Sequence, residues 1–337
     1  MQLPKESDLN LFPSGWYVIE QSENLLPRSI LSKQFVGNQI VLFRMENGQA
    51  CASMAHCPHL GAHLGLVGLI EGNLIRCPFH DFKFDALGAC VKGGNGVNHS
   101  PKAKLKMFPI LEKNKLIYIW YDITGLEPNW EIPSFAMDGW SKLLKKDWKI
   151  NIHQQVLVEK VLNNIQFVFS LQSTSVVVRK EVQLDKQRFN VSFTIHRNAG
   201  FWNRENDFFG VELSVQAFGL GVFVVEAFIP KYEIRTRYYI FPCPIDKNVV
   251  NLKIGLMVQN LNNPEKINPL FAFFPSMWIR DLILRFSFRA FKHYFFQDLK
   301  IHENKPPLCE PAFDDNDSLM GLYRKWSEQF YGNVPTE

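Results

Sequence analysis

Hydrophobic and polar residues alternate over short stretches between Gly15 and about Asp122. The runs GWYVIE, QIVLFRM, ACASMA, NLIRCPF, KFDALGACV and KLIYIWYD are separated by Gly, Asn and Pro. Short alternating runs with turn residues between them are typical of a small antiparallel sandwich or barrel. The segment that follows, TGLEPNWEIPSF (124–135), has no period and contains Pro, which favours a linker.

The pattern changes beyond this segment. Strand-like runs recur at KDWKINIHQQVL, SVVVRKEVQL, RFNVSFTIH, FFGVELSVQAF, GVFVVEAFI, EIRTRYYIFP and VVNLKIGLMV. Helical patterns are predicted in three segments, 158–171, 276–297 and 317–331. The sequence therefore predicts an α+β protein: a small all-β domain over 1–123, a linker over 124–138, and a domain over 139–337 with one large antiparallel sheet and flanking helices.

The composition fits two domains and narrows the setting. The chain has 337 residues, of which 46% are hydrophobic, and its net charge of +4 gives no case for nucleic-acid binding. The six Cys are not spaced as in a disulfide-rich secreted protein, and the start MQLPKESDLN is not a signal peptide. We therefore expect a reducing cytoplasm, with Cys243 and Cys309 as ordinary buried thiols.

The most apolar stretch is LFAFFPSMWIRDLILRFSFRAFKHYFF, residues 270–296. Charged residues interrupt it, so it is not expected to span a bilayer; they are Arg280, Asp281, Arg285, Arg289 and Lys292. The pattern favours an amphipathic helix with one face packed on a core, and contact with a membrane surface is the less favoured alternative. The expected location is cytoplasmic, with peripheral membrane contact left open.

Two clusters in CPHLGAHLGLVGLIEGNLIRCPFH, residues 57–80, carry the chemistry. Cys57 and His59 form C-x-H, and Cys77 and His80 form C-x-x-H. Two thiolates and two imidazoles bind zinc or an iron–sulfur cluster. Each Cys is followed by Pro, and the surrounding GAHLG and DFKFDALG supply turns rather than finger helices, which favours iron.

A Rieske [2Fe–2S] centre requires this donor set, with two Cys on one iron and two His on the other. Neutral imidazoles leave less negative charge on the cluster than thiolates do, which raises its potential to roughly −150 to +300 mV. Zinc is the less favoured alternative. His56 and His63 lie beside the ligands and are interpreted as loop residues rather than as neighbours that tune the ligands. Cys51 and Cys90 flank the motif and are interpreted as packing residues.

With these motifs the chain resembles the Rieske non-haem iron oxygenases, in particular the branch of 3-ketosteroid 9α-hydroxylase and cholesterol 7-desaturase. The resemblance is carried by CPHLGAHLG, CPFHDFKFDALGACV, PKAKLK and LIYIWYD, and near the far end by FFQDLKIHENKPPLCEP and LMGLYRKWSEQFYG. It covers most of the chain. It implies a Rieske domain followed by a larger oxygenase catalytic-type domain, and an electron-donating ferredoxin or flavin reductase as partner.

The resemblance also implies a second metal site, at which two His and one carboxylate hold a mononuclear Fe(II). The family pattern D-x-x-H-x-x-x-x-H aligns with Asn163, Gln166 and Leu171, so all three polar residues of the pattern are replaced. Asp298 aligns with the third ligand. An amide oxygen is a weak ligand for Fe(II) and leucine is none, so bound mononuclear iron is not expected.

Other residues offer one alternative ligand set. Asp298, His302 and Glu159 form a conceivable shifted site, and His153 and His293 lie near these segments in the sequence. Structural histidines remain the favoured interpretation. No His occurs between positions 154 and 195, so sliding the alignment recovers no ligand.

Three functions follow from this pattern. The favoured one is an electron-carrying partner subunit of an active paralogue, in a trimer of the kind that the resemblance implies, acting on a bulky apolar substrate. The second is an active monooxygenase or desaturase with unusual iron ligation, acting on a sterol-like or polyketide-like substrate. The third is a non-catalytic pseudoenzyme that binds a ligand or serves a structural role.

Overall fold

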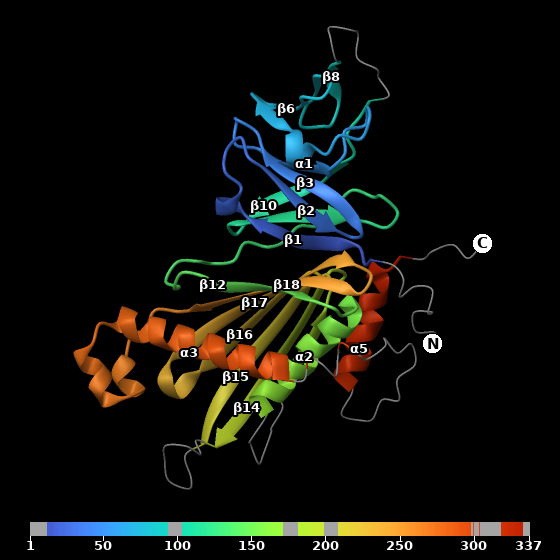
Figure 1. Ribbon diagram of the computed structural model, residues 1–337. Coiled ribbons are helices and arrows are strands. Elements are labelled where there is room, and N and C mark those ends of the chain that lie inside the picture. Colours follow the sequence, from blue (N-terminus) through green and yellow to red (C-terminus); the bar gives the residue numbers. More distant parts are fainter. Residues whose placement is uncertain are drawn as a thin grey trace. The chain divides into compact units, whose positions relative to one another are not determined.

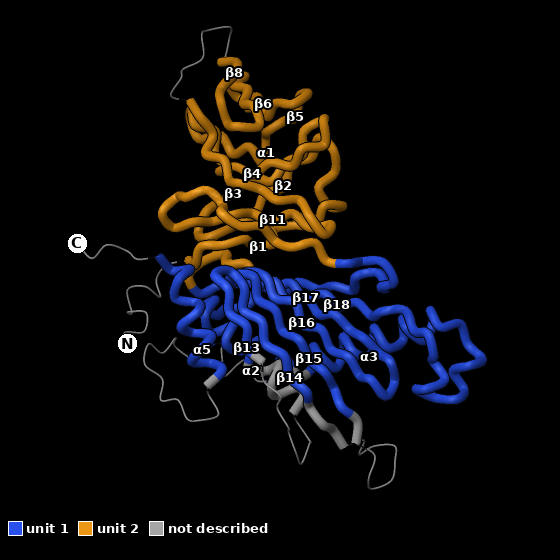
Figure 2. The backbone as a smooth tube through the Cα atoms, turned by 180° about the vertical axis from the view of Figure 1, so that it is seen from behind, with its two compact units in different colours: residues 1–10, 136–242, 248–337 blue, residues 11–135, 243–247 orange. Residues whose placement is uncertain are grey.

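The computed structural model describes seven parts of the chain, residues 12–93, 103–170, 181–198, 208–297, 299, 303 and 318–332 (Figure 1). They divide into two compact units (Figure 2). The first, here the β unit, runs to Phe135 and also includes Cys243–Lys247; the second, here the α+β unit, holds the rest from Ala136 onward. The division falls within the predicted linker.

Three sheets build the β unit. The first has the order β1-β11-β10, with bounds Gly15–Gln21, Leu116–Tyr121 and Ile110–Lys113. The second has the order β2-β3-β4-β9, with bounds Ile30–Phe35, Asn38–Arg44, Ala50–Met54 and Met107–Phe108. The third has the order β5-β6-β7-β8, with bounds Leu69–Glu71, Leu74–Cys77, Phe82–Phe84 and Cys90–Lys92. A short helix, α1 (Leu64–Val67), precedes β5.

Side chains explain why much of the predicted linker belongs to the β unit. The indole N–H of Trp16 in β1 donates to the carbonyl of Trp130 at 2.8 Å. The amide of Asn114 donates to the carbonyl of Pro133 at 2.9 Å. Residues 124–135 are thus bonded to β1 and to the turn between β10 and β11, both of which belong to this unit.

The α+β unit is one seven-stranded sheet with helices, and this confirms the predicted fold class. The strand order is β12-β18-β17-β16-β15-β14-β13, and every pair with a recorded register is antiparallel. The strand bounds are Leu144–Ile150 (β12), Glu181–Leu184 (β13), Arg188–Asn198 (β14), Phe208–Phe218 (β15), Val222–Ile229 (β16), Ile234–Asp246 (β17) and Val249–Val258 (β18). The helices are α2 (Gln154–Ser170), α3 (Ser276–Gln297) and α5 (Ser318–Ser327).

Alternation along the strands decides which face is covered. In β14 and β15, Phe193 pairs with Leu213, and both side chains are buried in the core that the helices share. From the helices, Leu157 of α2, Phe291 of α3 and Tyr323 of α5 enter the same core. All three helices therefore pack on one face of the sheet, as Figure 1 shows.

One strand prediction was too long. KDWKINIHQQVL was interpreted as a single strand, but β12 ends at Ile150 and α2 begins at Gln154. The imidazole Nδ1 of His153 accepts the backbone N–H of Gln155 at 3.2 Å, which satisfies a donor that a helix start leaves unpaired. The alternating pattern could not reveal this cap because His is not a frequent capping residue.

Among the described helices, none is both long and apolar enough to cross a bilayer.

Candidate metal centre

The first ligand loop follows β4 and is closed by its own backbone. The N–H of Cys57 donates to the carbonyl of Ala62, and the N–H of Gly61 donates to the carbonyl of Cys57, both at 2.9 Å. Gly61 has φ +77°, a backbone conformation that a residue with a Cβ adopts at a cost. The chain therefore reverses direction between Cys57 and Ala62, so that Cys57 and His59 lie in one tight loop.

The second ligand loop is the hairpin between β6 and β7. Cys77 pairs with Phe82 across the two strands, so His80 lies in the connection. Asp81 turns the chain with φ +59°, and its carboxylate accepts from Arg76 at 2.5 Å. Arg76 also donates to Glu71 in β5, which ties this loop to the neighbouring strand.

The two loops bring the four predicted residues together in like pairs. Both thiols are buried, Cys57 at 3% and Cys77 at 2% exposure, and they are hydrogen-bonded to each other. The imidazole rings of His59 and His80 have centroids 4.7 Å apart and are perpendicular. His59 is exposed and His80 is half-buried, so the sulfur atoms lie inside and the rings lie toward solvent.

The surroundings of the Cys57 thiol set the pKa at which it can become a metal-binding thiolate. Burial raises the pKa of Cys57 to about 11, and the N–H of His59 lowers it in part by donating to the sulfur. Metal ligation requires thiolates, so assembly of a metal centre here releases protons. A positive metal ion supplies the charge that stabilises buried thiolates.

The donor set fits a two-iron cluster. A [2Fe–2S] centre of the Rieske type requires one pair of thiolates and one pair of imidazoles on two separate irons. A structural zinc site requires four donors around one point. Here the two thiols are paired with each other and the two imidazoles are paired with each other, which favours the two-iron arrangement.

The other histidines and cysteines near the four ligands lie at different places in the β unit. His56 is exposed, and its ring meets that of His63 edge-on at 5.1 Å. His63 caps α1, where its Nδ1 accepts the N–H of Gly65 at 3.1 Å. Cys51 is buried in the core beneath the loops, and Cys90 is half-buried in β8.

Two family models match this chain. Residues 15–109 match the Rieske [2Fe–2S] domain, and residues 119–331 match the 3-ketosteroid 9α-hydroxylase C-terminal domain. The chain belongs to the Rieske oxygenase family. The Rieske domain implies a [2Fe–2S] cluster as its cofactor.

Relatives of this chain span nearly its whole length. It is 25% identical to a cholesterol 7-desaturase of Ciona intestinalis, over 95% of this chain and 69% of that protein. It is also 25% identical to a 3-ketosteroid-9-alpha-monooxygenase oxygenase component of Rhodococcus rhodochrous, over 96% of this chain and 82% of that protein. Its fold is similar to that of apo dicamba monooxygenase, with TM-score 0.68 and 17% identity over 96% and 98% of the two chains.

The second predicted site lies at the edge of the described structure. Positions 163 and 166 belong to α2. The side chains of Asn163 and Gln166 lie outside the described residues, as do Leu171, Asp298 and His302. The replacement of the family pattern at positions 163, 166 and 171 is therefore read from the sequence.

Glu159, proposed for a shifted iron site, is engaged elsewhere. Its carboxylate accepts from Arg324 of α5 at 2.7 Å and from the amide of Gln155 at 3.0 Å. The hydroxyl of Tyr331 donates to the same Gln155 at 2.8 Å. Both charged side chains of the Glu159–Arg324 pair are only 10% exposed. The carboxylate thus joins α2 to α5. The sequence did not predict this pair because Arg324 is 165 residues away from Glu159.

Beside this pair, the space between sheet and helices holds aromatic rings. Phe291 of α3 lies 4.9 Å from Tyr238 of β17 and 5.6 Å from Phe295, measured between ring centroids. The ammonium of Lys160 lies 5.5 Å from the centre of the Phe295 ring. The many Phe of this domain thus serve at least in part as core.

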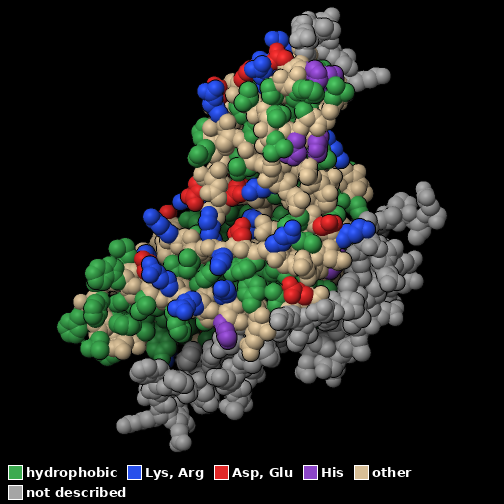
Figure 3. All heavy atoms as spheres, viewed as in Figure 1, with side chains coloured by type: hydrophobic (Ala, Val, Ile, Leu, Met, Phe, Trp, Pro, Cys, Tyr) green, Lys and Arg blue, Asp and Glu red, His purple; other side chains and the backbone are tan. Residues whose placement is uncertain are grey.

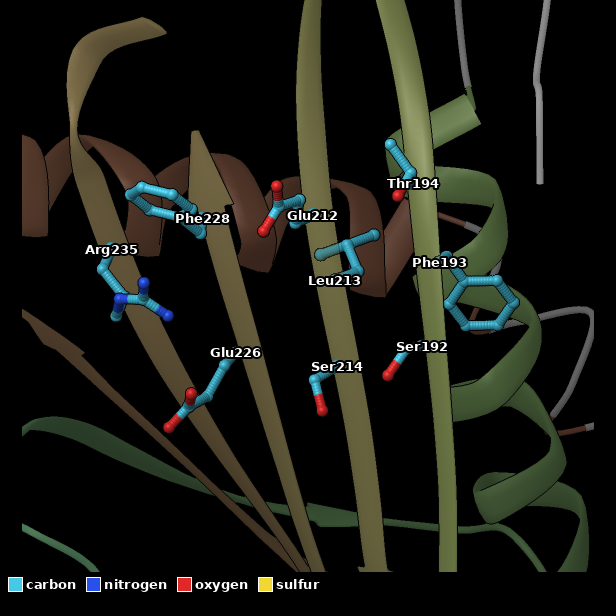
Figure 4. Close-up of a pocket in the computed structure, with 9 residues that line it drawn as sticks. All are labelled: Ser192, Phe193, Thr194, Glu212, Leu213, Ser214, Glu226, Phe228 and Arg235. Carbon is cyan, nitrogen blue, oxygen red and sulfur yellow. The ribbon is translucent and has the colours of Figure 1, made fainter. Parts of the chain in front are cut away.

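A pocket of about 270 Å³ lies on the face of the same sheet that is opposite the described helices (Figure 4). Ser192, Ser214 and Glu226 stand side by side across β14, β15 and β16. Glu226 accepts from Arg237 at 2.6 Å, and Arg237 also donates to the carbonyl of Ala136. These three polar residues form a row that was not identified from the sequence, although each alternates with buried residues along its strand. Through Glu226, Arg237 joins the start of the α+β unit at Ala136 to the sheet.

The Glu159–Arg324 pair gives a stability prediction. Arg324→Met removes the cation and leaves the Glu159 carboxylate buried without a counter-charge. We expect a loss of about 3–5 kcal/mol in the free energy of unfolding, measured by urea denaturation. Glu159→Gln combined with Arg324→Met removes both charges and should recover part of the loss. An unchanged midpoint in the single variant would contradict the structural role assigned to Glu159.

Proposed function

We propose that the chain is an electron-carrying subunit of a Rieske oxygenase system and works beside a related subunit that retains its own mononuclear iron. In this proposal Cys57, His59, Cys77 and His80 are the cluster ligands. The single observation that carries it is the contrast between this complete, paired donor set and the replaced donors of the second site.

The replaced positions explain why the chain needs a partner. Gln166 offers a neutral amide oxygen and Leu171 offers no donor atom, so Asp298 would be the one anionic ligand left. Fe(II) in the family is held by two imidazoles and a carboxylate. Asn163 lacks the negative charge of the aspartate that it replaces. Together these changes remove both the iron ligands and the charged link between the two redox centres.

The exposed face of the metal centre suits electron exchange. When bound, a Rieske cluster accepts and donates one electron at a potential of roughly −150 to +300 mV. The exposed ring of His59 would give an electron a short path from a docked donor protein to that cluster. The ring of Phe82 stacks on the ring of His59, with centroids 4.4 Å apart. We infer that a ferredoxin or flavin reductase donates the electron, in line with a relative that is named an oxygenase component.

The names of the relatives suggest the substrate class of the system. They are a cholesterol 7-desaturase and a 3-ketosteroid-9-alpha-monooxygenase, which act on bulky apolar molecules. We infer a substrate of this class for the partner subunit. We also infer a trimeric assembly, a reducing cytoplasmic setting and peripheral contact with a membrane.

Ligand substitutions test the cluster assignment. His59→Ala and His80→Ala each remove a donor from one iron, so we expect loss of the Rieske electron paramagnetic resonance signal of the reduced protein. His56→Ala is the matched control, because this exposed imidazole lies next to the motif and is assigned no iron. A wild-type signal in either ligand variant would rule out that residue as a ligand.

The partner function is tested by dioxygen consumption. With a reductase and an apolar sterol, the purified chain alone should consume no dioxygen in step with product. Addition of a related subunit with the complete iron pattern should couple the two, and His59→Ala in this chain should reduce the coupled rate. Coupled turnover by the chain alone would instead establish an active oxygenase with unusual ligation. No effect of the chain on its partner would support a non-catalytic pseudoenzyme.

A further inference from the structure

A dense apolar surface lies at the start of α3. Among the described residues, seven large hydrophobic side chains between positions 270 and 286 are well exposed: Leu270, Phe273, Phe274, Met277, Trp278, Leu282 and Phe286. We call this set the α3 patch. Phe273 is 82% exposed and Trp278 is 64% exposed. Figure 3 shows hydrophobic side chains gathered over this end of the α+β unit. Contiguous exposure of this kind marks an interaction surface.

The α3 patch is held in place from beneath. It begins in the 3₁₀ helix η6 (Pro269–Phe273) and continues onto the outer side of α3. Ile279 of α3 packs with Ile234 and Leu261 in a small core, with Phe271 and Ile283 against it. The inward side chains of the same segment are therefore already buried. The outward side chains of the patch are exposed and are not part of this core.

Positive charge continues the same outward stripe of the helix. Arg285, Arg289 and Lys292 follow Trp278 and Leu282 at helical spacing, and all three are exposed. They form no ion pair with the residues described. Arg280, by contrast, is paired with Asp281. One face of α3 thus changes along its length from apolar and aromatic to basic.

This order fits one kind of partner. Aromatic and leucine side chains enter the boundary between lipid headgroups and acyl chains, while Arg and Lys bind anionic headgroups at the surface. A 22-residue helix with exposed cations on its outer face is suited to lying on a bilayer rather than to crossing it. We propose that the α3 patch docks the protein on anionic membranes, with the rings inserted and the three cations on the headgroups.

This inference names the surface for the peripheral contact in the proposed function. A bulky apolar substrate dissolves in the bilayer, so a subunit held there keeps the oxygenase assembly beside its substrate. That benefit rests on the proposed function. Binding to lipid does not, because it requires neither a partner subunit nor turnover.

Vesicle sedimentation with the cluster-loaded full chain tests the proposal. The wild type should bind vesicles of phosphatidylcholine with phosphatidylserine and bind phosphatidylcholine alone far more weakly. Phe273→Ser with Trp278→Ser should reduce binding by about tenfold or more. Arg285→Gln with Arg289→Gln should reduce binding by about tenfold or more on the anionic vesicles and remove the preference for them.

The matched control is Leu26→Ser with Leu126→Ser. These leucines are 62% and 68% exposed but lie in the β unit, so vesicle binding should not change. Far-ultraviolet circular dichroism, rather than absorption of the cluster, checks that each variant folds, because the cluster ligands lie in the β unit and do not report on α3. Wild-type protein that stays in solution, or patch variants that bind like the wild type, would overturn the proposal. So would loss of the inferred trimer, or of any other self-association, in the patch variants with unchanged vesicle binding, because the occupant would then be a second copy.

Discussion

The placement of two buried sulfur atoms beneath two outward imidazoles is the constraint on which the rest of this account depends. Two short loops from different sheets meet there, one closed by backbone bonds around Cys57 and one fixed by the Arg76–Asp81 ion pair. Neither loop alone carries enough donors for a cluster. Because the donors come in like pairs, the site suits two irons, and because the imidazoles lie outward, the electron has a route to a partner.

The α+β unit has the fold of the Rieske oxygenases, and its sequence carries Asn, Gln and Leu at positions 163, 166 and 171. Its helices cover one face of the sheet, and α2, where the family carries the metal-binding residues, is anchored through Glu159 to Arg324. The proposed function rests on a contrast within the sequence. The Rieske ligands are complete in the sequence, whereas these three positions offer no imidazole or carboxylate, so the proposal assigns catalysis to a related subunit.

Local patterns predicted much of this structure, and tertiary contacts account for the rest. The runs 208–218 and 249–258 coincide with β15 and β18, because long strands with one buried face alternate clearly. The cluster motif was visible because its donors are close in sequence. The Glu159–Arg324 pair and the polar row through Glu226 were not visible, since each depends on partners far along the chain. The cap of α2 by His153 was missed because the signal is a single atypical residue.

The most direct test of the central claim is the count of iron and acid-labile sulfide in the purified full-length protein, with Mössbauer spectra to separate the iron species. The account predicts a [2Fe–2S] cluster as the sole iron species, with equal iron and sulfide and no high-spin mononuclear Fe(II). Additional, tightly bound ferrous iron without matching sulfide would contradict it and make this chain an oxygenase in its own right.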